Sequence, residues 1–213
     1  MPFDLAVVDL DNTLYAADSG VFARMDERMT RFVARELGVE AEEANRLRLL
    51  YWRQYGTTLR GLILHHGVEP EPFLHEVHDI GVHEMLQPDT ALDAALADMP
   101  GRKVIHTNGT REHAERVLSA LGIRQHFASI YDIRFNTYTP KPCANTLRTL
   151  LDAEAVLPAR ALIIDDMEDN LVAAQSIGAQ TALVSGAQTS GKWTYHADSF
   201  TGLCQLIRQV GVS

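Results

Sequence analysis

The sequence predicts an α/β protein in which a parallel sheet is covered by helices on both faces, with a helical segment inserted after the first strand. Three observations lead to this prediction. The chain opens with an apolar run at 5–8 that turn-forming residues cut off. Residues 18–84 then show helical spacing of apolar side chains without a strand pattern. Beyond Pro88, short apolar runs alternate with helical segments, which is typical of βαβ units.

The first strand is predicted at Leu5–Val8, because a short apolar run that ends in turn formers is typical of a buried strand in a parallel sheet. The polar segment Asp9–Thr13 follows it directly. This segment is therefore expected at the carboxyl end of the strand, where open α/β sheets bind ligands.

The segment after this strand reads as a helical insert with no sheet of its own. Glycines at positions 38, 56 and 67 separate its helical patterns, as expected for residues that end helices. The chain is therefore divided into a core of residues 1–16 and 86–213 and an insert of residues 17–85. The helices expected in the insert cover Asp26–Leu37, Ala41–Tyr55, Thr58–His65 and Pro70–Asp79.

The second half of the chain alternates between the two kinds of pattern. Right-handed crossovers between its strands give one parallel sheet with helices on both faces. The expected strands are Lys103–His106, Ala128–Asp132, Ala161–Ile164 and Thr181–Val184. The expected helices are 89–98, Arg111–Leu121, Ala144–Leu151, Glu168–Ile177 and Phe200–Val210.

The composition is that of a globular protein, with 46% hydrophobic and 22% charged residues among 213. The 19 Lys and Arg residues against 28 Asp and Glu residues give 19 − 28 = −9, a net charge that argues against a nucleic-acid polymer or an anionic membrane as the main partner. A small phosphorylated substrate stays compatible with this charge, because a bound divalent cation can reverse the local potential.

The expected compartment is the cytoplasm. The two cysteines, Cys143 and Cys204, have no metal-finger spacing and fit a reducing environment. The first cationic residue is Arg24, so no basic segment precedes an apolar stretch as in a signal peptide. No apolar run reaches the ~18 residues of a membrane helix. The oligomeric state is left open by the sequence.

Asp9 and Asp11 lie two residues apart at the first strand end. Side chains at i and i+2 of a strand point to the same side, so both carboxylates are expected to address one point. Two carboxylates in one site repel each other, which raises one pKa or requires a cation. One can then act as nucleophile while the other moves protons. A polar strand end with a helix cap is the alternative explanation of such a pair.

Three further strand ends also supply polar groups. The second strand is followed by Thr107–Gly109 ahead of a helix N-terminus, which is a natural seat for an anion. Lys141 lies between two prolines after the third strand, and the fourth strand ends in Asp165 and Asp166. Because the carboxyl ends of parallel strands meet at one edge of the sheet, these groups are expected to form one site.

In order and context, these segments resemble the four motifs of the haloacid dehalogenase-like (HAD) hydrolases. The resemblance spans nearly the whole chain and implies a Rossmann-like core with the helical insert as a small cap. The segments that carry it are Asp9–Leu14, Thr107–Asn108, Lys141–Pro142 and Asp165–Asp166.

The resemblance also implies roles for the acidic residues. Asp9 would attack phosphorus and form an aspartyl-phosphate, and Asp11 would protonate the leaving oxygen and then activate water. Mg²⁺ would bind the Asp9 carboxylate, the Asp11 backbone carbonyl and one residue of the last motif. The spacing to Asn170, which resembles a position that supports the metal through water, favours Asp166 over Asp165 as that ligand.

The remaining motif residues are implied to handle the phosphate. Thr107 and the backbone of Asn108 would hold it, while Lys141 would neutralise the charge on Asp9 and on the phosphoryl oxygens. Haloalkanoate dehalogenases of this superfamily lack an acid–base aspartate, since breaking a carbon–halogen bond needs no proton; Asp11 therefore favours phosphoryl transfer. The residues expected to support the site are Thr13, Asp165 and Asn170.

One segment of the insert bears on the substrate. Tyr51–Leu62 resembles the YxxYGxxLRGL segment of the pyrimidine 5′-nucleotidase branch of the superfamily. Tyr51, Tyr55 and Arg60 are candidates to stack on a nucleobase and to hydrogen-bond its edge. The alternative is that the two tyrosines, four residues apart, pack the insert. The resemblance thus favours a pyrimidine nucleoside 5′-monophosphate such as UMP or CMP as substrate.

The histidines suggest no catalytic role. His75, His78 and His83 have a spacing that could hold Zn²⁺, but the sequence has no HExxH pattern and no cysteine partner near them. Solvated or helix-capping histidines are therefore the preferred interpretation. His106 is expected to pack at its strand end.

The expected activity is that of a Mg²⁺-dependent phosphomonoesterase. One alternative is a phosphatase of the same superfamily with broad or sugar-phosphate specificity. A non-catalytic binding protein on this scaffold is disfavoured, because the nucleophile, the lysine and the metal-binding aspartate are all present. A dinucleotide-binding protein is disfavoured because the first strand is followed by Asp-Leu-Asp-Asn-Thr and not by a glycine-rich loop.

Overall fold

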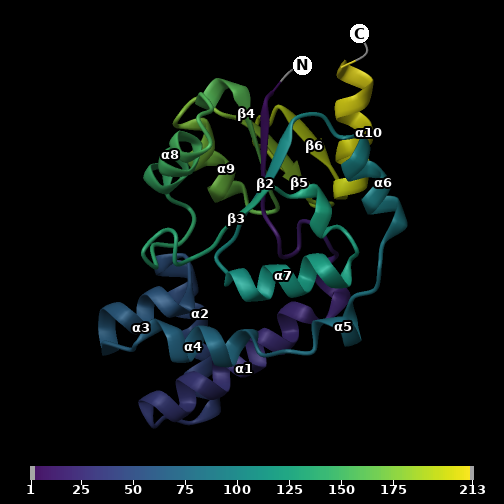
Figure 1. Ribbon diagram of the computed structural model, residues 1–213. Helices are drawn as coiled ribbons and strands as arrows, with labels where there is room; N and C mark the ends of the chain where they lie inside the picture. Colours follow the sequence, from purple (N-terminus) through teal and green to yellow (C-terminus); the bar gives the residue numbers. More distant parts are fainter. Residues whose placement is uncertain (1–2, 212–213) are drawn as a thin grey trace.

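The computed structural model describes residues 3–211 and confirms the predicted α/β class. Within these residues the strands form one six-stranded sheet of order β3-β2-β1-β4-β5-β6, and every neighbouring pair is parallel (Figure 1). The strands are β1 (Leu5–Val8), β2 (Arg102–His106), β3 (Ser129–Tyr131), β4 (Ala161–Asp165), β5 (Gln180–Val184) and β6 (Tyr195–Ala197).

The strand order places the two central strands on either side of a switch point. Strands β2 and β3 lie on one side of β1, whereas β4, β5 and β6 lie on the other. Val8 pairs with Ile105 on β2 and with Ile164 on β4, so Asp9, which follows β1, emerges level with the ends of both neighbours. Open α/β sheets bind ligands in the crevice at such a switch point.

Helices cover both faces of the sheet. On β1, Ala6 and Val8 join the apolar cluster beneath α6 (Thr90–Asp98), α7 (Arg111–Ala120) and α10 (Phe200–Gly211). Leu5 and Val7 point the other way and join the cluster beneath α8 (Ala144–Ala153) and α9 (Glu168–Gln175). This alternation along one strand is why its four residues are all apolar and all buried.

The insert is helical, as expected from its sequence pattern. It contains α1 (Val21–Leu37), α2 (Ala41–Tyr55), α3 (Thr58–His66), α4 (Pro70–His78) and the short α5 (Val82–Met85). These helices lie together beyond the carboxyl ends of the strands (Figure 1). Their buried side chains are continuous with the apolar cluster beneath α6, α7 and α10, so the insert is packed onto the core.

Some short elements were not predicted. Helix α1 begins at Val21, five residues before the expected start, directly after Gly20 in a left-handed conformation. Strand β6 has 3 residues and α5 has 4, which is too short for a periodic pattern to develop. Three single turns of 3₁₀ helix at Ala17–Ser19, Arg124–His126 and Pro158–Arg160 complete the structure.

No helix within residues 3–211 is both long and apolar enough to cross a membrane.

Candidate active site

Asp9 lies at the centre of a buried group of charges at the end of β1. Its backbone N–H donates to the Ile164 carbonyl at 2.9 Å, which fixes the residue against β4. The Thr13 hydroxyl donates to Asp9 Oδ2 at 3.0 Å, and the Lys141 ammonium donates to Oδ1 at 2.5 Å. Thr13 therefore supports the Asp9 carboxylate directly, as its place in the first motif suggested.

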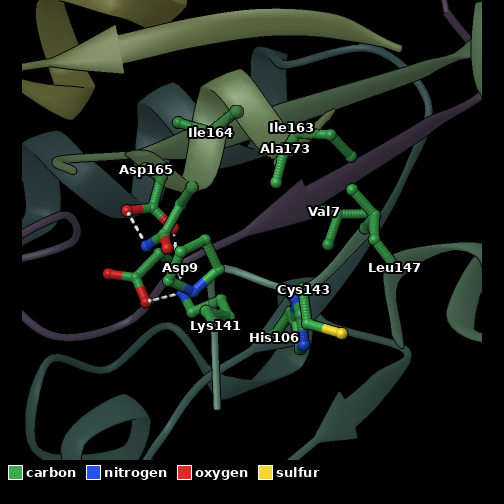
Figure 2. A pocket seen from close by; sticks show the side chains of 12 residues that line it. Val7, Asp9, His106, Lys141, Cys143, Leu147, Ile163, Ile164, Asp165 and Ala173 are labelled. Atoms are coloured by element: carbon green, nitrogen blue, oxygen red, sulfur yellow. Dashed lines mark hydrogen bonds and ion pairs between the residues drawn. The ribbon is translucent and has the colours of Figure 1, made fainter. Parts of the chain in front are cut away.

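Lys141 joins two of the strand ends. Its ammonium also donates to Asp165 Oδ2 at 2.8 Å, so one cation lies between the aspartate after β1 and the aspartate that ends β4 (Figure 2). Burial alone would lower the pKa of Lys141, but the neighbouring Asp165 and Asp9 raise it above its ordinary value. The lysine is therefore a permanent cation in the site.

Three carboxylates form the acidic cluster of the described residues. One oxygen each from Asp9, Asp165 and Asp166 lies within 4.8 Å of the others, a group that could hold a metal ion. Burial and the two neighbouring carboxylates raise the pKa of Asp9 above its ordinary value, against the effect of Lys141. Burial and Asp165 raise the pKa of Asp166 to about 6. Such a cluster favours a bound cation, and its carboxylate oxygens are the ligands that Mg²⁺ prefers.

The structure distinguishes the two aspartates of the last motif. Asp165 Oδ1 accepts hydrogen bonds from the Asn170 amide at 2.8 Å and the Met167 N–H at 2.9 Å, and its other oxygen binds Lys141. No other side chain in residues 3–211 donates a hydrogen bond to Asp166. Asp166 thus has free acceptor capacity for a metal. Asn170 holds the Asp165 carboxylate, and its support of a metal through water stays a prediction.

Thr107 and Asn108 follow β2, and Asn108 contacts the loop that carries Lys141. The Thr107 hydroxyl is buried and accepts from the Gly109 N–H at 2.9 Å. The Asn108 side chain has a function that the sequence did not suggest. Its Oδ1 accepts from the backbone N–H of Lys141 at 2.8 Å and its Nδ2 donates to the Lys141 carbonyl at 3.4 Å. Asn108 therefore fixes the loop that carries the lysine.

Asp11 lies outside the acidic cluster of Asp9, Asp165 and Asp166. Strand β1 ends at Val8, so the i and i+2 geometry of a strand does not apply to Asp9 and Asp11, which corrects the expectation of two carboxylates on one face of a strand. Asp11 Oδ1 accepts from the Tyr15 hydroxyl at 2.5 Å and from His113 Nε2 at 2.8 Å. Burial raises the pKa of Asp11, but these two partners bring it below its ordinary value.

His113 and His78 are the functional candidates that the sequence reasoning missed. His113 has 0% exposure, and its Nδ1 has no hydrogen-bond partner among the described residues. Because an ionised carboxylate only accepts hydrogen bonds, His113 Nε2 is the donor in the contact with Asp11 Oδ1. The signal available in the sequence was the position of His113 in the first turn of α7, the helix that follows Thr107 and Asn108.

His78 corrects the expectation of solvated or capping histidines in the insert. It is buried, with its ring 4.8 Å from that of His113 and its Nδ1 2.9 Å from the Leu74 carbonyl. Burial and the neighbouring His113 lower the pKa of His78 to about 4, so it is neutral at physiological pH. It belongs to no group of metal-binding side chains within residues 3–211.

His106 packs at the end of β2, as expected. Its ring lines a small cavity beside Lys141 and Cys143 (Figure 2). Its Nε2 lies 3.2 Å from the Asn136 amide nitrogen, and burial together with Lys141 lowers its pKa to about 3. A neutral imidazole here leaves Lys141 as the cation next to Asp9.

Two of the three candidate residues of the insert lie near the catalytic group, while Tyr51 lies inside the insert. The Tyr51 ring is buried and stacks on His65 at 5.4 Å, and its hydroxyl lies 2.7 Å from His66 Nε2. Tyr51 thus packs α2 against α3. Tyr55 and Arg60 line a cavity of about 590 Å³ that reaches Lys141, Asn108 and Asn170.

A second cavity of about 380 Å³ lies on the Asp11 side. Trp52, Gly56 and Asn108 line both cavities and separate them. At Gly56, with φ 83°, an added Cβ would lie 2.8 Å from the Lys141 carbonyl oxygen. The turn that ends α2 is therefore in direct contact with the catalytic loop.

The sequence as a whole matches a known family. Residues 3–178 match the sequence profile of the haloacid dehalogenase-like hydrolases. The chain belongs to this family. It is therefore a HAD hydrolase, with the aspartates and the lysine of its motifs gathered at one edge of the sheet.

A curated relative of this HAD hydrolase matches most of the chain. Phosphate metabolism protein 8 of Saccharomyces cerevisiae is 29% identical over 185 residues, which cover 80% of this chain and 58% of that protein. The chain thus spans little more than half the length of that relative.

Two solved structures share the fold. The HAD phosphatase from Thermococcus onnurineus has a TM-score of 0.64 at 15% identity and covers 98% of both chains. The L-2-haloacid dehalogenase from Xanthobacter autotrophicus, with chloropropionic acid covalently bound, also has a TM-score of 0.64, at 14% identity, over 97% of this chain and 98% of its own. At these identities the likeness shows the fold alone, and a phosphatase and a dehalogenase share it.

Proposed function

We propose that this HAD hydrolase is a Mg²⁺-dependent phosphomonoesterase that works through an aspartyl-phosphate. The observation that carries the proposal is Asp11, a second carboxylate held by Tyr15 and His113 next to the cavity where a leaving group would lie. A phosphate ester needs a proton on its leaving oxygen, whereas a carbon–halogen bond does not. Asp11 therefore favours a phosphatase over a dehalogenase.

In the proposed first step, Asp9 attacks phosphorus. A bond forms between an Asp9 carboxylate oxygen and phosphorus, the bond from phosphorus to the ester oxygen breaks, and that oxygen takes the proton that Asp11 carries at the start of the cycle. Tyr15 and His113 both donate to Asp11 Oδ1, so Oδ2 is the oxygen that carries this proton, and the lowered pKa of Asp11 makes the acid give it up readily. Lys141, at 2.5 Å from Asp9, stabilises the negative charge that develops on the phosphoryl oxygens. Thr13 keeps the attacking carboxylate in place through its hydrogen bond to Oδ2.

In the proposed second step, water attacks the phosphorus and gives a proton to Asp11. The bond from phosphorus to Asp9 breaks, which releases phosphate and restores both carboxyl groups. The Asp9 and Asp166 carboxylates and the Asp11 backbone carbonyl would hold Mg²⁺, which would neutralise charge on the phosphate and on the acidic cluster. Thr107 and the Asn108 backbone, at the end of β2, would hold the phosphoryl oxygens.

For the substrate we propose a pyrimidine nucleoside 5′-monophosphate, with a phosphatase of broad or sugar-phosphate specificity as the second candidate. The support is the resemblance of Tyr51–Leu62 to the pyrimidine 5′-nucleotidase branch, together with cavities of about 590 and 380 Å³ beside the catalytic group. Volumes of this size are typical of small-molecule sites. The helical insert would act as a cap over the bound ester and exclude water.

The test is phosphate release from UMP, CMP, AMP, GMP, glucose 6-phosphate and p-nitrophenyl phosphate, with Mg²⁺ and with EDTA. Chloride release from 2-chloropropionate is measured in parallel. Mg²⁺-dependent phosphate release without chloride release supports the phosphatase, and a preference for UMP and CMP supports the nucleotidase. Chloride release without phosphate release would replace the proposal with a dehalogenase. Equal rates across the panel would favour broad specificity.

A further inference from the structure

The cavity next to Asp11 differs in chemistry from the cavity next to Lys141. Its wall is mainly apolar and is supplied by α1, α2, α4 and the start of α3. The apolar side chains that line it are Phe22, Met25, Met29, Leu49, Trp52, Leu59, Phe73, Leu74, Val77 and Ile133. Methionine and aromatic side chains of this kind adapt to the faces of flat rings.

The proton donor fixes which of the two cavities receives the leaving group. A general acid must lie within hydrogen-bond distance of the oxygen that it protonates. Asp11 lines the apolar cavity and not the one that holds Tyr55 and Arg60. An ester with its phosphorus at Asp9 and its leaving oxygen at Asp11 therefore extends into the apolar cavity.

An ion pair forms part of the wall of this cavity. Arg48 Nη1 donates to Asp26 Oδ1 at 2.6 Å, and Arg48 Nε and Nη2 donate to Asn45 Oδ1 at 3.2 and 3.0 Å. Both charged residues line the apolar cavity on one side and a shallow hollow on the outer surface on the other. The Arg48 side chain is only 12% exposed.

The ion pair has unused hydrogen-bonding capacity. A guanidinium has five N–H donors and a carboxylate accepts several hydrogen bonds, so the bonds above leave donors on Arg48 and an oxygen on Asp26. A donor beside an acceptor is what a planar amide-like edge requires, because that edge presents an acceptor oxygen next to an N–H. The pair thus offers polar recognition in the wall of a mainly apolar cavity.

The charges that face the cavity also restrict the leaving group. They are Asp11, Asp26 and Arg48, while the buried His78 is neutral. Asp11 enters the step protonated, and Asp26 and Arg48 neutralise each other, so this lining offers no unpaired cation to a leaving group that carries a second phosphate or a carboxylate. The other cavity, lined by Arg53, Arg60 and Lys141, has the opposite character.

Given the proposed phosphatase activity, we infer that the apolar cavity binds the leaving group and that the Asp26–Arg48 pair recognises its polar edge. The ligand class is an uncharged leaving group with a flat heterocycle, such as a nucleoside. This places base recognition on α1 and α2 and not on Tyr55 and Arg60.

The test compares kcat/KM for UMP, fructose 1,6-bisphosphate and p-nitrophenyl phosphate in the wild-type protein and in Arg48→Met. Methionine keeps the apolar stem and removes the guanidinium. Loss of one hydrogen bond from a charged group predicts a fall of about 10- to 100-fold for UMP. The value for p-nitrophenyl phosphate should change by less than about threefold, because its leaving group lacks the N–H beside an acceptor that the pair would recognise. The wild-type protein should also prefer UMP to the bisphosphate, whose leaving group is anionic.

Arg46→Met is the matched control. Arg46 is on the same helix and forms an exposed ion pair with Glu43, outside both cavities, so this variant should keep the wild-type values for all three substrates. Asp26→Asn is a second probe that preserves side-chain shape. It should also lower kcat/KM for UMP more than for p-nitrophenyl phosphate.

Three outcomes would overturn the inference. Equal losses on UMP and p-nitrophenyl phosphate in both Arg48→Met and Asp26→Asn would make the pair structural. Loss of the UMP preference in Arg60→Met but not in Arg48→Met would move recognition to the other cavity. A wild-type preference for the bisphosphate would refute the charge argument. If wild-type protein releases phosphate from none of the three esters, the proposed phosphatase activity itself fails, which is a distinct result.

Discussion

Replacement of His113 by phenylalanine should slow turnover selectively for esters that need a proton on the leaving oxygen. Phenylalanine fills nearly the same volume and preserves the ring contact with His78, which lies at 4.8 Å. It removes the Nε2–H that donates to Asp11 Oδ1 at 2.8 Å. Tyr15 still donates to the same oxygen, so Asp11 keeps one of its two partners.

The expected magnitude follows from the nature of this hydrogen bond. The bond is made to a carboxylate by a side chain with 0% exposure, and hydrogen bonds to charged groups contribute about 1.5–3 kcal/mol. At 1.36 kcal/mol per tenfold change in rate, kcat for UMP should fall by about 10- to 150-fold. The remaining bond from Tyr15 limits the loss, so values in the lower half of this range are expected.

Two assays separate a positioning role from a structural one. The first is steady-state kcat on UMP, and the second is the rapid-mixing burst of p-nitrophenol from p-nitrophenyl phosphate, whose leaving oxygen needs no proton. The burst rate should change by less than about threefold. His113→Gln, whose amide can reach the same position, should recover part of kcat on UMP. Equal losses in both assays, or no loss in either, would refute the positioning role of His113.

Three further changes test other parts of the structure. Asp9→Asn should reduce turnover to background while leaving the thermal midpoint within a few degrees of wild type, because it removes the nucleophile with almost no change in volume; phosphate release and circular dichroism check this, and unchanged turnover would exclude the aspartyl-phosphate. Asp166→Ala should raise the Mg²⁺ concentration needed for half-maximal activity by at least about tenfold, because even loss of a residue that only supports a metal ligand commonly lowers metal affinity about 10-fold or more. An unaltered Mg²⁺ titration would mean that Asp166 does not bind the metal. Glu71→Gln should destabilise the protein above about pH 4.5 and not near pH 2. The hydrogen bonds that Arg134 donates to Glu71 are the main cause that lowers the pKa of Glu71 from 4.5 to about 2; burial opposes them, and the hydrogen bond from Tyr138 adds to them. The resulting stabilisation is present above the unfolded-state pKa and is lost as the pH falls toward 2. Because the Glu71 side chain is 51% exposed, the effect should stay below about 1 kcal/mol. Thermal midpoints of both proteins between pH 2 and 7 measure it, and a constant difference across that range would contradict the assignment.

Local sequence patterns predicted the regular elements well. Helix α2 has the predicted bounds, Ala41–Tyr55, because an acidic first turn and a glycine after the last residue define both of its ends. The apolar run of β4 was equally clear, since all five of its residues are buried. Strand β6, with 3 residues of which only Tyr195 is buried, has no pattern that distinguishes it from a loop.

The motif residues could be predicted as a group, but their individual contacts could not. Neighbouring strand ends in a parallel sheet necessarily bring Asp9 and Asp165 together. The contact between Asp11 and His113 joins residues 102 positions apart, and no local periodicity encodes a contact at that separation. The chemistry of the cavity beside Asp11 likewise depends on how α1, α2 and α4 pack, and sequence spacing does not determine that.

The contact between Gly56 and the Lys141 carbonyl limits how this protein can change. The joint has no room for a Cβ, and its backbone conformation is one that only glycine adopts readily. A new insert that brought any other residue to this joint would displace the loop that carries the lysine. Exchange of inserts between relatives, in evolution or in the laboratory, must therefore keep a glycine at this position. An insert without it would change the specificity and displace Lys141 as well.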